Sequence, residues 1–202
     1  MTTVQTRPPT AEETVRVGQL TAAVILTWIV FALLADLEPN GLHLLVLGAL
    51  RVVLFAALLA FAVRAGATRS WLGRAGLGVT GAMAVLNLIG GAGAVVTDGW
   101  SYNPFDESVT AAAPWYGYVS GGSALLFAVG TVLVGVAGRR AGWLAAAAVA
   151  AGAIFPLVFF LGEFLSDEVL SESTGELLGH LMWVSAWLAL ALGLAMSRGR
   201  RA

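Results

Sequence analysis

The sequence contains no cysteine and no lysine, and only 11% of its 202 residues are charged. The absence of cysteine excludes a disulfide-stabilised scaffold. An average soluble domain carries about 25% charged residues, whereas this chain combines its low charge with 58% hydrophobic residues. Disorder is excluded as well, because disordered chains need low hydrophobicity and high net charge. The composition therefore indicates an integral membrane protein that crosses the bilayer several times.

Six stretches are apolar and long enough for a helix to cross a hydrocarbon core of about 30 Å, which takes about 20 residues. They cover residues 17–35, 42–63, 75–96, 115–137, 143–162 and 177–196. The sequence therefore predicts an all-α fold, a polytopic membrane protein built as a bundle of six transmembrane helices. We expect one domain over residues 16–197, between a disordered cytoplasmic tail over 1–15 and a short basic cytoplasmic tail over 198–202.

The charged residues between these stretches are sorted by sign. Ten of the eleven arginines lie before the first stretch, after the last, or in the second and fourth connections. The other three connections are acidic. Because basic residues mark the cytoplasmic side, both termini are expected in the cytoplasm, and the location is expected to be a prokaryotic plasma membrane, crossed several times.

Glycine and proline add two local expectations. The third and fourth stretches are rich in glycine, including Gly117 and Gly121. Small residues let membrane helices approach closely, so we expect these two helices to pack tightly against each other. Pro156 removes a backbone donor from the fifth stretch, which predicts a kink there.

Arg51 is the one arginine that breaks the sorting by sign. It precedes Arg64 by thirteen residues, which places it about 20 Å from the basic boundary and near the centre of the bilayer. A charge at that depth costs at least about 2.5–3.5 kcal/mol on insertion scales. By the same counting, Asn87 and Ser185 lie at the depth of Arg51. Two interpretations remain open: these polar groups fix helix register, or they bind a lipid headgroup, a quinone or a small anionic ligand.

A second polar group is expected nearer the outer surface. It comprises His43, Glu163, Glu176 and His180, and the last two have the i, i+4 spacing of many metal-ligand pairs. His43, His180 and Glu176 are the candidate metal ligands. The alternative function is accordingly an outer-leaflet enzyme that uses these histidines and carboxylates for metal or acid–base chemistry.

Ser120 opens the fourth stretch and His180 opens the sixth, both on the outer side. In these two positions and in the number of spans, the chain resembles the rhomboid proteases, which implies a serine protease within the membrane. The family's Gly-x-Ser-Gly motif is not reproduced, because the sequence reads Gly117-Tyr-Val-Ser120-Gly121. The long first outer loop of that family is also missing.

The leading expectation is a membrane protein without enzymatic activity: a small-molecule or lipid binder, a permease-like protein or an accessory subunit of a membrane complex. Its expected partners are the lipid bilayer, a lipid, quinone or small anionic ligand, and a membrane-complex partner. No cofactor is expected. No nucleic acid is expected either, because the chain has no basic patch interleaved with aromatic residues.

Overall fold

The computed structural model describes residues 10–34, 41–96, 114–165 and 172–196, and within these ranges the chain is helical and has no strand. The helices are α1 (Ala11–Leu34), α2 (Gly41–Arg64), α3 (Trp71–Val96), α4 (Pro114–Ala137), α5 (Trp143–Leu165) and α6 (Glu172–Met196), with 3₁₀ turns η1 (Ala67–Arg69) and η2 (Arg139–Ala141). Side chains are described over residues 10–26, 45–46, 48–92, 122–157, 178–179 and 181–196. The predicted all-α fold with six helices is confirmed.

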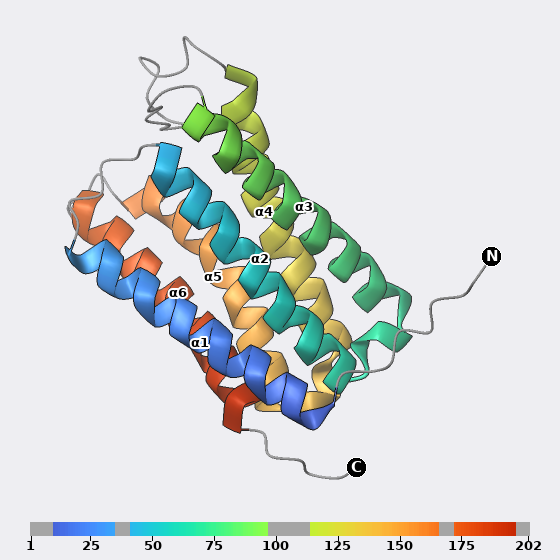
Figure 1. Cartoon of the computed structure of the whole chain (residues 1–202). Coiled ribbons are helices and arrows are strands. Elements are labelled where there is room, and N and C mark those ends of the chain that lie inside the picture. Colours follow the sequence, from blue (N-terminus) through green and yellow to red (C-terminus); the bar gives the residue numbers. More distant parts are fainter. Residues whose placement is uncertain (1–9, 35–40, 97–113, 166–171, 197–202) are drawn as a thin grey trace.

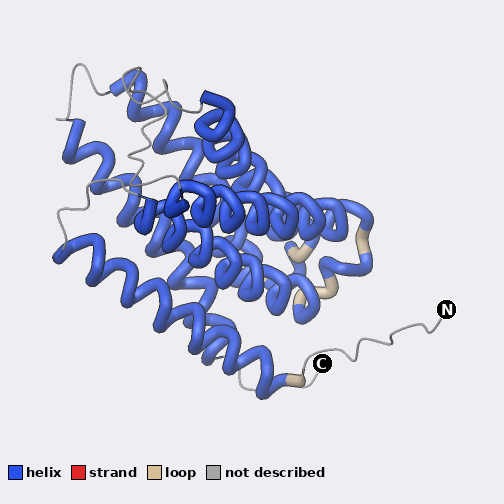
Figure 2. Tube along the Cα trace, turned by 45° about the horizontal axis from the view of Figure 1, so that its top comes forward, coloured by secondary structure: helices blue, strands red, loops and turns tan. Residues whose placement is uncertain are grey.

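Consecutive helices run in opposite directions and form a closed bundle (Figure 1). Each helix contacts its neighbours along the chain, and α1 also contacts α6, which closes the ring. The turns around η1 and η2 lie together at one end of the bundle (Figure 2). We call this the basic end, because it holds every described arginine except Arg51.

The core is centred on α2, which contacts α4 and α6 in addition to its chain neighbours α1 and α3. Its Leu54, Leu58 and Phe61 side chains are almost completely buried. Trp187 and Leu190 of α6 are buried to the same degree. Arg51 lies three residues before Leu54 and shares this enclosed face of α2, whereas Val52 and Leu59 on another face are exposed.

Helices α3 and α4 meet through a pair of glycines. A Cβ atom added to Gly76 would lie 2.7 Å from the backbone oxygen of Gly130, and one added to Gly130 would lie 2.8 Å from the backbone oxygen of Gly76. Both distances are too short for a real side chain, so each glycine is needed for the approach. The expected tight packing of these two helices is confirmed, while the side-chain surroundings of Gly117 and Gly121 lie outside the described residues.

Buried hydroxyl groups are satisfied within their own helices. Thr21 donates to the Val17 oxygen, Thr80 to the Gly76 oxygen and Thr131 to the Phe127 oxygen, each at 2.8 Å. All three threonines are fully buried. Such i−4 bonds satisfy a hydroxyl without help from water, so these positions do not require a polar environment.

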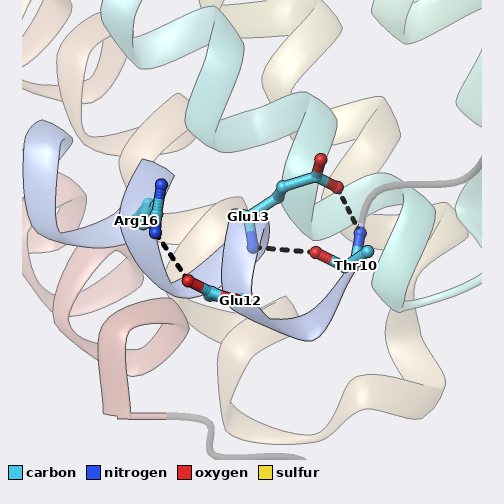
Figure 3. Close-up of polar contacts among 4 residues, drawn as sticks. All are labelled: Thr10, Glu12, Glu13 and Arg16. Atoms are coloured by element: carbon cyan, nitrogen blue, oxygen red, sulfur yellow. Dashed lines mark hydrogen bonds and ion pairs between the residues drawn. The ribbon is translucent and has the colours of Figure 1, made fainter.

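Helix α1 begins with a capping box (Figure 3). The Glu13 backbone N–H donates to Thr10 Oγ1 at 3.2 Å, and the Thr10 backbone N–H donates to the Glu13 carboxylate at 2.5 Å. One turn on, Arg16 pairs with Glu12 on an exposed face. Such reciprocal bonds satisfy two of the free donors at a helix start. Residues 11–15 are therefore helical, although the sequence placed them in a disordered tail.

One described helix meets the length and composition expected of a membrane span, over Trp71–Ala92 of α3. The described apolar stretches Gly122–Ala137, Trp143–Leu157 and Leu181–Met196 are shorter. A membrane location is thus weakly indicated, and the six-span arrangement stays a prediction. Helix α5 continues through Pro156, and the kink expected at this residue also stays a prediction.

Candidate functional site

The site begins where α2 crosses α3 at Gly48. A Cβ atom added there would lie 2.6 Å from the backbone oxygen of Asn87 and 2.8 Å from Cα of Leu88. The two backbones therefore touch at this level. Residues three apart on a helix share a face, so Arg51 projects toward the same interface as Gly48. One turn further along α2, the Phe55 ring packs against Gly81 of α3.

Arg51 and Asn87 are joined by a hydrogen bond across this interface. The Arg51 Nη1 group donates to Asn87 Oδ1. The Asn87 Nδ2 group donates to the backbone oxygen of Met83 at 2.8 Å, which orients the amide so that its oxygen faces the guanidinium. Asn87 is only 7% exposed. A buried, oriented amide thus serves as a neutral acceptor for a partly buried cation.

Arg51 also lines a small, half-open cavity between four helices. The remaining lining residues come from three other helices: Ala124, Phe127 and Ala128 of α4, Phe155 of α5 and Trp183 of α6. The volume available to the centre of a water molecule is about 10 Å³. A space of that size holds about one water molecule. Apart from Arg51, the walls are apolar or aromatic.

An aromatic cluster adjoins this cavity. Its members are Phe127, Phe155, Trp183 and Trp187. The Phe155 and Trp183 ring centroids are 6.1 Å apart, those of Trp183 and Trp187 6.4 Å, and those of Phe127 and Trp187 6.0 Å. These distances are in the range of favourable tilted and edge contacts. Trp187 is 1% exposed, and its Nε1 group has no hydrogen-bond partner among the described residues.

No carboxylate whose side chain is described forms an ion pair with Arg51. Those carboxylates are Glu12 and Glu13, in the first turn of α1. The other described arginines belong to the beginning of α1, the end of α2, η1, the beginning of α3 and η2, at the basic end of the bundle: Arg16, Arg64, Arg69, Arg74, Arg139 and Arg140. Within the described part of the chain, Arg51 has a neutral partner and no opposite charge.

Ser185 is not brought to this site. Its side chain is exposed on α6, and its hydroxyl donates to the Leu181 oxygen of the same helix at 2.5 Å. Two residues correspond to about 200° around a helix, so Ser185 faces away from the side that carries Trp183 and Trp187. The expected triad is therefore reduced to Arg51 and Asn87, and whether these two bind a ligand stays a prediction.

The residues expected to form an outer polar group lie outside the described side chains. His43 belongs to α2, Glu163 to α5, and Glu176 and His180 to α6. Ser120 belongs to α4, and its side chain is not described either. Their assignment as metal ligands or catalytic groups stays a prediction.

The aromatic walls of the cavity were not predicted from the sequence. Trp183 and Trp187 are four residues apart, and both lie well inside the sixth apolar stretch. Tryptophans usually lie at the membrane boundary. Two of them at this depth and on one helix face could therefore have indicated aromatic residues in the interior of the bundle. Phe127 and Phe155 gave no comparable signal, because phenylalanine is common in any apolar stretch.

Comparisons with protein families, with curated proteins and with solved structures found no match for the chain.

Proposed function

We propose that the chain is a six-span plasma-membrane protein, with both termini in the cytoplasm, that binds a small lipid-soluble ligand at Arg51. The observation that carries the ligand site is the position of Arg51: a partly buried cation on α2 that faces an aromatic cavity, with one neutral hydrogen-bond partner among the described residues. A guanidinium has five N–H donors. A ligand with an oxygen acceptor would use donors that Asn87 leaves free.

The outer surface of the bundle supports the membrane part of the proposal. The six helices contain 23 to 26 residues each, enough at 1.5 Å per residue to cross a core of about 30 Å. Large apolar side chains are exposed on every helix, for example Leu20, Leu59, Ile89, Val129, Leu157 and Met182. Such a surface suits lipid and would be unfavourable in water.

The topology is tested by cysteine labelling, for which this cysteine-free chain gives no background. Single cysteines replace Thr68 in η1, Ala141 in η2, and Ser101 and Ser171 in the acidic connections. A membrane-impermeant maleimide is expected to label positions 101 and 171 in intact bacterial cells, and positions 68 and 141 only after permeabilisation. Labelling of all four positions in intact cells, or of none after permeabilisation, would contradict the topology.

The ligand site is tested by thermal unfolding in mild detergent, with and without added lipid extract or quinone. Wild-type protein is expected to unfold several degrees higher with the effective addition, since a ligand that binds only the folded state stabilises it. Arg51→Leu is expected to lose this shift. Ser185→Ala is the matched control, because Ser185 lies at similar depth on an exposed face. If no addition shifts the wild type and Arg51→Leu is at least as stable, the site proposal is wrong.

A further inference from the structure

We infer that the ligand of the Arg51 site is an apolar monocarboxylate: one carboxylate head on a hydrocarbon or aromatic body. This inference rests on the proposed function and specifies its ligand. Within the described part of the chain the partner of Arg51 is the neutral Asn87, so a negative charge is the element that the site lacks. A quinone would supply acceptors without supplying that charge.

The geometry of the remaining Arg51 donors favours a carboxylate over other oxygen acceptors. Asn87 occupies a single N–H group of Nη1. Within the described part of the chain, the edge formed by Nε and Nη2 keeps its two parallel N–H groups available. A carboxylate accepts such a pair with both oxygens, which is the strongest arrangement an arginine offers. An alcohol or a single carbonyl oxygen would use only part of that edge.

The rest of the cavity favours a ligand with few polar groups. Its other walls are the side chains of Ala124, Phe127, Ala128, Phe155 and Trp183. These walls present aromatic and methyl surface, against which additional polar groups of a ligand would be unpaired and costly. A phosphodiester headgroup with an attached choline or glycerol, or a sugar, is therefore disfavoured. A molecule with one polar end suits this lining.

The size of the cavity limits the polar head of the ligand. The cavity has room for about one water molecule, which is close to what a carboxylate head needs and far below a phospholipid headgroup. Because the cavity is half open, the apolar body is expected to extend from it along Phe155 and Trp183, which line it. Binding is expected to bring the ligand chain within contact distance of Trp183.

The test uses quenching of tryptophan fluorescence in the purified full-length protein. A medium-chain fatty acid brominated on its chain is compared with the brominated alcohol of equal length, because bromine quenches tryptophan on contact. We expect saturable quenching with at least about tenfold tighter binding for the acid, the factor that about 1.4 kcal/mol of charge-assisted bonding gives. Phenylacetate and the quinone menadione, added as competitors, distinguish an aromatic carboxylate and a neutral carbonyl ligand from a fatty acid.

Two variants keep the result interpretable. Asn87→Asp retains the size of the side chain and places a carboxylate beside Arg51, so it is expected to abolish saturable quenching by the acid. Arg51→Lys keeps the charge and loses the paired donors, so it is expected to bind the acid at least several-fold more weakly. Ser185→Ala should bind like wild type.

The outcomes separate this inference from the proposed function. Equal binding of acid and alcohol, or stronger competition by menadione than by either carboxylate, would overturn the monocarboxylate while leaving a ligand site at Arg51. Quenching by the acid that is unchanged in Asn87→Asp and Arg51→Lys would also overturn it. If neither these compounds nor lipid extract affect the wild type, the proposed function fails with it.

Discussion

Gly76→Leu is expected to destabilise the native bundle strongly. A Cβ atom at this position would lie 2.7 Å from the Gly130 oxygen, 2.9 Å from Val134 Cγ2 and 3.0 Å from Leu133 Cβ. The first of these atoms is backbone and cannot move without displacing α4. Overpacking of this kind usually costs about 1–3 kcal/mol and sometimes more, and a leucine adds three further carbon atoms beyond the Cβ. We expect a loss of at least about 3 kcal/mol.

The matched control lies two residues away on the same helix. Gly78 is exposed, and an added Cβ atom would meet nothing within 4 Å. Leucine is favoured over glycine in a helix by up to about 1 kcal/mol, so Gly78→Leu is expected to be neutral or stabilising. Unfolding of both variants in mild detergent, followed by near-ultraviolet circular dichroism, measures the contrast. Equal stability of the two variants would show that α3 and α4 do not pack through Gly76.

The glycine contact illustrates which part of the fold was predictable. Apolar length and charge sorting identified all six helices, because each of those signals is local in the sequence. Glycine content also indicated close packing of the third and fourth helices. The particular pair Gly76 and Gly130 was not predictable, since both helices contain several glycines and the pairing depends on how far one helix slides and rotates against the other.

For the site, the sequence predicted the depth of the polar residues in the bundle but not the direction in which their side chains point. Counting residues from the basic boundary placed Arg51, Asn87 and Ser185 at one depth, and the structure brings the first two together. Ser185 does not join them, because the depth of a residue does not determine which face of its helix it occupies. On α6 the inward face carries Trp183 and Trp187, and Ser185, about 200° from each of them around the helix, is exposed. The aromatic cluster could have supplied that direction if its tryptophans had been taken as interior residues.

The start of α1 was predictable in principle. Thr10 is followed three residues later by Glu13, which is the pattern of a capping box before an apolar helix. Two prolines and several threonines upstream favoured a disordered tail instead. The reciprocal bonds between Thr10 and Glu13 place the helix start at Ala11, ahead of the apolar stretch, because capping and not hydrophobicity decides where this helix begins.

Asn87→Leu is expected to be the most destabilising single polar-to-apolar change in the described residues. It removes the acceptor of the Arg51 Nη1 group and leaves a partly buried cation facing aromatic walls. Removing one partner of a buried charged hydrogen bond costs the desolvation of the group that remains, about 3 kcal/mol for a charge. Arg51→Leu is expected to be far milder, because it leaves only an amide oxygen unpaired and also removes a charge whose insertion is costly.

The pair is resolved by a double-mutant cycle in the ligand-free protein. Because Asn87→Leu acts through the stranded guanidinium, the double variant with Arg51→Leu is expected to recover most of the stability that Asn87→Leu loses. Residues in contact commonly show coupling energies of about 0.5–3 kcal/mol, and we expect a value near the top of that range. Unfolding midpoints of the four proteins in the same detergent provide the measurement. Additive losses would mean that Arg51 does not depend on Asn87, and that the two residues do not act as one polar site within the bundle.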